Sequence, residues 1–220
     1  MPFPRAKTNR YDPGVRMPLA VRWPGRIPAG RVVDDLESHL DFTPTFLEAA
    51  GAAAPAAFID RSLLPVLTSR AAGRIDPTRD AASTALERYT WCRPDGGTYP
   101  MRALRTAEFL YVRNFAPDRW PTGGPDFLSS NKTFHGDGAP IKAFREAPAN
   151  QRRFPVPFAL CDGKRPLEGR YDVRADPHQI NHLATDPAHR ATREKLWQQL
   201  RAYLDKTGDP RIAGRDPWPA

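Results

Sequence analysis

The stretch "RAKTNRYDPGVRMPLAVRWPG", from Arg5 to Gly25, contains the pattern on which the expected fold depends. Within residues 17–23, apolar and other side chains alternate, and this period of two predicts a β-strand with Met17, Leu19, Val21 and Trp23 on one face. The Pro-Gly pair that follows predicts a turn. Because a strand this apolar needs neighbours on both sides, we expect it to lie inside a larger sheet.

Composition indicates a globular chain with long connections. Of the 220 residues, 40% are hydrophobic and 26% are charged, which is ordinary globular usage and argues against wholesale disorder. The 25 prolines are about twice the usual share of roughly 5%. We therefore expect few regular elements, joined by extended or irregular segments.

The net charge of +8 favours anionic partners in general, such as nucleic acid, an acidic membrane surface, or sulfated or phosphorylated substrates. Its basic residues are dispersed among acids and form only short pairs, such as Arg152-Arg153 and Lys164-Arg165, so the sequence does not favour nucleic-acid binding. No apolar run approaches the ~18 residues of a membrane span, and residues 1–14 lack the apolar centre of a secretory leader. As written, the chain is expected in the cytoplasm, without a membrane partner.

Local signals place three helical segments. Thr43 is expected to cap a helix that Pro44 opens and Gly51 ends. A short helical turn follows at residues 62–67. Near the C-terminus, Asp186 caps and Pro187 opens an amphipathic helix over residues 187–206, which Gly208 closes.

Short stretches rich in β-branched and aromatic residues predict strands at residues 84–91, 100–106, 108–114 and 169–173. The second and third are close enough for a hairpin. Residues 115–168 read as a long loop, a length that indicates function or disorder. The expected fold of this part is α+β, a small antiparallel sheet packed by a C-terminal helix.

The order Lys7-Thr8-Asn9, Tyr11-Asp12-x-Gly14, Pro18-Leu19-x-Val21 and Trp23-Pro24-Gly25 resembles the segment that follows the second metal-binding Asp-Asn pair of sulfatases. "SHLDFTPTFLEAAG", "RSLLPVL" and "YDVRADPHQINHLATDP" are similar to later segments of that family. "PFPRAKTN", "YPMRAL" and "GDPRIAGRDPWPA" look most like heparan N-sulfatases, also called N-sulfoglucosamine sulfohydrolases. The resemblance spans nearly the whole chain but only the later portion of the enzyme.

The resemblance implies an alkaline-phosphatase-like α/β fold. Residues 1–70 would be the end of the catalytic α/β domain. Residues 71–220 would be a C-terminal subdomain with the antiparallel sheet, the long loop 115–168 and the closing helix 187–206. The full-length family uses calcium and a formylglycine made from Cys or Ser in C/S-x-P-x-R to hydrolyse sulfate esters or sulfamates of sulfated saccharides. Those parts would lie before Met1, in a missing N-terminal catalytic domain, so this chain is expected to bind no cofactor and to be inactive alone. The parent enzyme would be periplasmic, secreted or lysosomal.

By family match, Lys7 is the candidate that contacts the sulfate; an exposed, mobile lysine is the alternative. Glu87, Arg88, Arg102 and His135 are candidate substrate-binding residues, with ordinary surface pairing or solvation as the alternative. No residue is assigned to a metal.

"CRPDG", from Cys92 to Gly96, matches the first three places of C-x-P-x-R, but glycine replaces the final arginine, so we read Cys92 as a structural thiol. Cys92 and Cys161 can pair, although two buried thiols are favoured. His178 and His182 have metal-ligand spacing but lie in a turn-rich stretch. A non-catalytic module that binds sulfated saccharide or a protein partner is the competing hypothesis.

Overall fold

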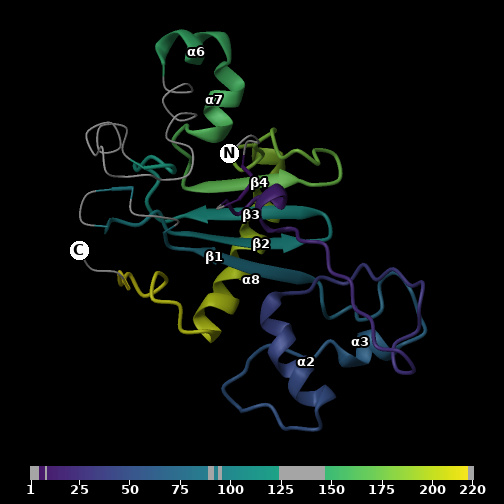
Figure 1. Cartoon of the computed structure of the whole chain (residues 1–220). Coiled ribbons are helices and arrows are strands. Elements are labelled where there is room, and N and C mark those ends of the chain that lie inside the picture. Colours follow the sequence, from purple (N-terminus) through teal and green to yellow (C-terminus); the bar gives the residue numbers. More distant parts are fainter. Residues whose placement is uncertain (1–4, 8, 89–91, 94–95, 124–146, 218–220) are drawn as a thin grey trace. The chain divides into compact units, whose positions relative to one another are not determined.

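The computed structural model describes residues 5–7, 9–88, 92–93, 96–123 and 147–217 (Figure 1). The chain forms two compact units. The first comprises Met1–Arg16, Thr84–Leu104 and Glu108–Ala220, and the second comprises Met17–Ser83 and Arg105–Ala107. The expected boundary between residues 70 and 71 stays a prediction. Within the described ranges, every helix is too short or too polar to cross a bilayer.

A four-stranded antiparallel sheet in the order β1-β2-β3-β4 lies mainly in the first unit. Its strands are β1 (Ala81–Leu86), β2 (Met101–Thr106), β3 (Phe109–Asn114) and β4 (Glu168–Asp172). The expected hairpin of β2 and β3 and the last strand are confirmed. The expected strand at residues 84–91 is shifted: β1 begins at Ala81 and ends at Leu86, and residues 89–91 lie outside the described part.

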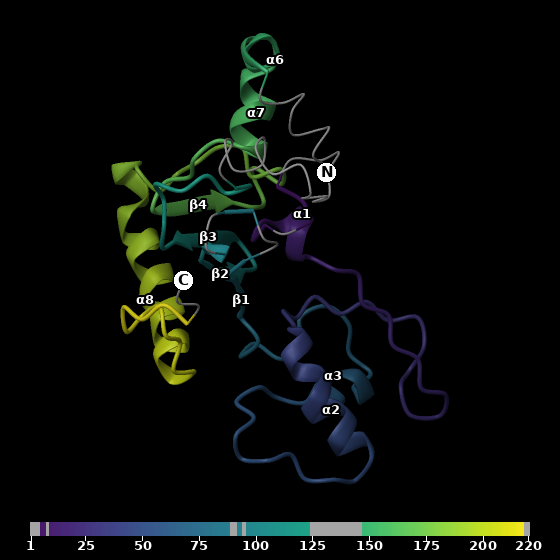
Figure 2. The same cartoon turned by 60° about the vertical axis from the view of Figure 1, so that its left-hand side comes forward.

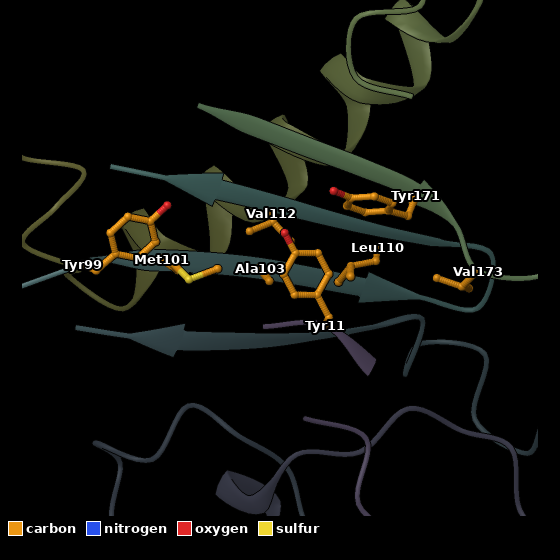
Figure 3. Close-up of a cluster of buried hydrophobic side chains, with 8 residues drawn as sticks. All are labelled: Tyr11, Tyr99, Met101, Ala103, Leu110, Val112, Tyr171 and Val173. Carbon is orange, nitrogen blue, oxygen red and sulfur yellow. The ribbon is translucent and has the colours of Figure 1, made fainter. Parts of the chain in front are cut away.

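One face of the sheet carries the core of the first unit. Alternate positions of β2, β3 and β4 supply it, because successive side chains of a strand point to opposite faces. Figure 3 shows these side chains together with Tyr11, which comes from the N-terminal segment, and Tyr99, which precedes β2. The cluster consists of Tyr11, Tyr99, Met101, Ala103, Leu110, Val112, Tyr171 and Val173, all at most 9% exposed.

The opposite face packs against α8 (Arg190–Lys206), whose Leu196, Leu200 and Leu204 are buried. Tyr111 of β3 contacts Trp197, with 6.2 Å between ring centroids. Figure 2 shows α8 on one side of the sheet and α1 (Asp12–Val15) on the other. The short 3-10 helix η3 (Pro187–His189) directly precedes α8. As expected, Asp186 caps its start, because the Asp186 side chain accepts a hydrogen bond from Ala188 N at 2.9 Å. The expectation that a C-terminal helix packs the small sheet is confirmed.

The expected long loop 115–168 is wrong in its later part. Two short helices lie there, α6 (Pro148–Arg153) and α7 (Pro155–Cys161), while residues 124–146 lie outside the described part. Both helices have proline in the first turn, where the missing N–H costs no hydrogen bond. The high proline content, read as a loop signal, marks helix starts here.

The second unit contains the 3-10 helix η1 (His39–Asp41), α2 (Phe42–Ala49) and α3 (Leu64–Thr68). The expected cap at Thr43 is wrong. Ser38 caps instead, because its side chain and that of Asp41 form a reciprocal capping box, and the helical segment starts five residues earlier. The helix stops as expected before Gly51, which adopts a φ of 72°.

The expected strand at residues 17–23 is also wrong. The residues have no regular secondary structure, and Met17, Leu19 and Val21 are 52%, 47% and 44% exposed. The turn after them is present, because Arg26 N donates to Trp23 O at 3.0 Å. A period of two forms a strand only where another strand offers hydrogen bonds, and within the described residues none pairs with this segment.

We predict that the purified chain binds an environment-sensitive hydrophobic dye through this apolar segment. The triple substitution Met17→Ser, Leu19→Ser, Val21→Ser is expected to reduce dye fluorescence and light scattering markedly. Val32→Ser, at a single apolar side chain that is 71% exposed, serves as the control and is expected to change little. Equal dye binding by the wild-type and triple-variant proteins would contradict the prediction.

Candidate functional site

The N-terminal segment folds back on itself before it reaches the sheet. Asn9 N donates to Ala6 O at 3.1 Å, which closes a turn with Lys7 on its exposed side. Gly14 lies against this turn: a Cβ atom there would lie only 2.5 Å from the carbonyl oxygens of Ala6 and Asn9. Only glycine permits this approach, so Gly14 helps to set the position of the loop that carries Lys7.

Tyr11 fixes the same segment to the core. It is 2% exposed, and its ring meets that of Tyr171 edge-on, with 5.6 Å between centroids. Two guanidinium groups lie over the Tyr11 ring, Arg5 at 4.3 Å and Arg165 at 5.0 Å from the centroid. We call Arg5, Tyr11, Tyr99, Arg165 and Tyr171 the tyrosine–arginine cluster.

Arg165 joins the cluster to the Lys7 turn. Its side chain is buried, and Nη2 donates to Asn9 Oδ1 at 2.8 Å. Arg5 donates to the backbone carbonyl of Gln179, and Gln179 Oε1 accepts from Asp12 N at 3.0 Å. The segment before α1 is thus tied to residues more than 150 positions later in the chain.

The cations of the cluster change the acidity of its phenols. Burial alone would raise the pKa of Tyr11, but the charges of Arg165 and Arg5 outweigh burial and lower that pKa below its ordinary value. Tyr99 behaves in the opposite way, because burial outweighs the neighbouring cations and raises its pKa to about 12. Burial, helped by Tyr11, also raises the pKa of Tyr171. The cluster therefore places two phenols that favour the neutral form beside one that ionises more readily.

Two of the predicted substrate-binding residues, Glu87 and Arg102, contact each other. Arg102 Nη2 lies 2.5 Å from Glu87 Oε1, and Arg102 Nε lies 2.7 Å from Asp209 Oδ2. Arg211 binds the other oxygen of Glu87 at 2.5 Å and also binds Asp216 at 2.7 Å. This carboxylate–arginine network ties the segment after α8 to the sheet, and a substrate role for its members stays a prediction.

The remaining candidates are dispersed or undescribed. Arg88 Nη1 donates to Gly96 O at 3.0 Å, and His135 lies outside the described residues. Cys92 is buried and Cys161 is half-buried, and neither forms a disulfide. His182 Nε2 lies 2.8 Å from the carbonyl oxygen of Glu168, as a structural contact. In the described ranges, no three His, Cys, Asp or Glu side chains gather in a way that could hold a metal ion.

Sequence reasoning missed most of the cluster. It gave Tyr11 only as part of the Tyr11-Asp12-x-Gly14 motif and Arg165 as half of a short basic pair. A tyrosine within an otherwise polar loop was a usable signal for Tyr11, since such a large ring is usually buried against other apolar groups. Nothing local marks Arg165, whose importance depends on contacts with Asn9, far away in sequence.

Comparison with known proteins adds to this geometry. Residues 6–92 match the family described as N-sulphoglucosamine sulphohydrolase, C-terminal. The chain is 25% identical to an ulvan-active sulfatase of Formosa agariphila over 90% of this chain and 34% of that protein. It is 28% identical to human N-sulphoglucosamine sulphohydrolase over 98% of this chain and 42% of that protein. The chain thus spans about a third to two fifths of the length of these relatives.

Two solved structures share the fold. The protein BT4656, in complex with its substrate D-glucosamine-2-N,6-O-disulfate, aligns with a TM-score of 0.55 at 19% identity, over 86% of this chain and 28% of that one. A protein from work on glycosaminoglycan metabolism by Bacteroides thetaiotaomicron aligns with a TM-score of 0.53 at 20% identity, over 88% of this chain and 31% of that one.

The sheet, its covering helix and these matches define a C-terminal sulfatase region with the mixed α/β fold of sulfatases. Within that class, residues 6–92 match the C-terminal region of N-sulphoglucosamine sulphohydrolase. The resemblance stated from the sequence is confirmed.

We predict that Arg102→Met lowers the free energy of unfolding by about 3–5 kcal/mol, because Glu87 and Asp209 would lose a buried counter-charge. Urea unfolding followed by circular dichroism measures this. Arg201→Met is the matched control: it removes an exposed pair with Asp205 at 3.6 Å and is expected to cost at most about 0.5 kcal/mol. Similar costs for both variants would show that the network is not structural.

The raised pKa of Tyr99 makes the free energy of unfolding depend on pH. Because folding raises its pKa from about 10 to about 12, the neutral phenol contributes stability below pH 10, and this contribution is lost as the pH rises toward 12. Between pH 10 and pH 12, the free energy of unfolding of Tyr99→Phe is therefore expected to fall by roughly 2–3 kcal/mol less than that of wild type. Urea unfolding at stepped pH values tests this; equal slopes for the two proteins would refute the assignment.

Proposed function

We propose that this chain is the C-terminal part of a sulfatase that hydrolyses sulfate esters or N-sulfate groups of sulfated sugars. The observation that carries the proposal is the match of residues 6–92 to the C-terminal region of N-sulphoglucosamine sulphohydrolase, on the segment that presents Lys7. The names of the ulvan-active and N-sulphoglucosamine relatives and the disulfated ligand of BT4656 point to the same substrate class.

In this proposal Lys7 supplies the cation that contacts the sulfate. Its side chain is on the exposed side of a turn whose neighbours, Arg5 and Asn9, are fixed by the tyrosine–arginine cluster. A cation that is held in place before the reaction stabilises charge on the sulfate oxygens without a further cost of reorganisation. The loop contacts would thus position Lys7, while Lys7 itself would meet the substrate.

Formylglycine and calcium are the chemical groups of the whole family, where they supply the nucleophile and the metal that activates it. In this sequence, only Pro94 has Cys or Ser two residues before it, and Gly96 stands where C/S-x-P-x-R needs arginine. We therefore assign the nucleophile and the calcium ligands to another part of the enzyme, and expect the 220 residues alone to hydrolyse no sulfate.

The net charge of +8 supports a second candidate, a non-catalytic module that binds sulfated saccharide. Both candidates predict sugar binding. They differ in whether any polypeptide that contains these residues releases sulfate.

We predict no sulfate release from D-glucosamine-2-N,6-O-disulfate by the purified chain with added calcium. A longer polypeptide that includes the coding sequence upstream is expected to release it. In the longer protein, Lys7→Ala should lower kcat/KM by about 100-fold or more, as loss of a charge-stabilising donor does, while Lys206→Ala at the end of α8 serves as the control. Activity of the short chain would overturn the assignment of the nucleophile. Binding of the sugar without hydrolysis by either protein would favour the binding module.

A further inference from the structure

Arg165 is a buried cation without an acidic partner in the part of the chain that the structure describes. It is 5% exposed; Nη2 donates to the neutral amide oxygen of Asn9, and the Tyr11 hydroxyl is its other hydrogen-bonding neighbour. Nε and Nη1 are buried and have no hydrogen-bond partner. A guanidinium carries five N–H donors, and a buried charge is normally paired because its desolvation is costly. Arg165 therefore lacks most of the acceptors that its environment should supply.

Three other buried arginines have acceptors, whereas Arg170 resembles Arg165, because its Nε and Nη1 also lack a hydrogen-bond partner. Arg170 lies 4.4 Å from the centroid of the Phe109 ring, and Arg165 shares the Tyr11 ring with a second guanidinium, that of Arg5. Arg79 lies 2.9 Å from Asp41, and Arg102 is held by Glu87 and Asp209. Arg93 donates to the carbonyl oxygens of Trp120 and Pro121. The groups that act electrostatically on Arg165 are the phenols of the tyrosine–arginine cluster, which outweigh its burial and raise its pKa.

Most of the other unpartnered buried atoms of the tyrosine–arginine cluster and its neighbours are donors, although Asn114 Oδ1, on a side chain that donates to Pro166 O, is an acceptor. Arg5 Nε and Gln179 Nε2 are buried without hydrogen bonds, as is the hydroxyl of Tyr99, which can donate. The orientation of the Gln179 amide follows from its own bond, since its oxygen accepts from Asp12 N. An excess of donors and of positive charge in one place is complementary to a ligand that only accepts hydrogen bonds, as sulfate and carboxylate groups do.

We propose that Arg165 and Arg5, which both lie within about 5 Å of the centroid of the Tyr11 ring, form a binding site for an oxyanion of the sulfate type. The anion completes the hydrogen bonds of Arg165 Nε and Nη1 and of Arg5 Nε. That the sulfate is carried by a sugar rests on the proposed function; the site itself rests on the unpaired donors.

Access to the site passes through the N-terminal segment. Arg5 and Asn9 are half-buried, whereas Tyr11 and Arg165 are buried, so the anion reaches Arg165 when Arg5 and Asn9 move aside. Arg5 and Gln179 hold left-handed φ angles of 55° and 56°, which cost non-glycine residues roughly 1 kcal/mol each and are maintained by the contacts around them. Binding would couple sulfate to the position of Lys7, two residues from Arg5.

Thermal unfolding of the full chain in sodium sulfate and in sodium chloride of equal ionic strength tests the site. Sulfate stabilises folded proteins in general, so the evidence for a site is the difference between wild type and variants in the shift of the unfolding midpoint. Wild type is expected to unfold about 4 °C higher in sulfate at roughly ten times the dissociation constant. Arg165→Met should lose this sulfate-specific shift, yet keep or raise its midpoint in chloride, because an uncompensated charge has been removed. Arg113→Met is the control: Arg113 stacks at 4.8 Å on Trp197, against the other face of the sheet, and this variant should keep the shift.

Arg165→Lys keeps the charge without the planar fork and should bind inorganic sulfate about tenfold more weakly in calorimetric titration. Equal sulfate shifts in wild type and Arg165→Met would overturn the proposal. A large loss of stability of Arg165→Met in chloride would also overturn it, since it would show that Arg165 is already compensated. Calorimetry with D-glucosamine-2-N,6-O-disulfate separates the two proposals. If Arg165→Met binds the sugar as well as wild type does, the proposed site is wrong but the proposed function stands. If sulfate binding depends on Arg165 but the longer protein never hydrolyses the sugar, only the proposed function is wrong.

Discussion

The burial of Tyr11 against the sheet is the contact on which the first unit depends. Tyr11 belongs to a polar segment at the start of the chain, yet its ring lies against Tyr171 and close to two guanidinium groups. A buried aromatic ring of this size contributes a few kcal/mol, enough to order the loop around it. Because Lys7 is four residues away, the same contact that completes the core also sets the candidate sulfate contact.

The buried arginines of the first unit have different kinds of neighbours. Arg102 is paired with two carboxylates, and its bond to Asp209 holds the segment after α8 against the sheet, so its charge has a structural role. Arg165 meets phenols and one amide, so its charge is left without a full partner inside the described residues. An unsatisfied buried group calls for a specific explanation, and a bound ion is one of these. Arg170 also lacks partners at Nε and Nη1, so what distinguishes Arg165 is the second guanidinium, that of Arg5, over the same ring.

Sequence reasoning succeeded where the signal is local. The helix α8 follows from its cap at Asp186 and its leucine spacing, and β2, β3 and β4 follow from short apolar runs beside turns. It failed for residues 17–23, where alternation without a paired strand leaves an exposed extended segment, and for α6 and α7, whose prolines start helices. Lys7 follows from a motif, whereas the role of Arg165 arises only when residues 156 positions apart meet. Such a contact has no local pattern to reveal it.

Hydrogen exchange of the amides in α1 tests most directly whether the N-terminal segment belongs to the folded core. Gly14 and Val15 donate to Tyr11 O, and Arg16 donates to Asp12 O. If burial of Tyr11 orders this segment, these amides should exchange about as slowly as those of β3, through global unfolding, and Tyr11→Ala should make them exchange much faster than those of β3. Rapid exchange in the wild-type protein, like that of a frayed terminus, would contradict the account.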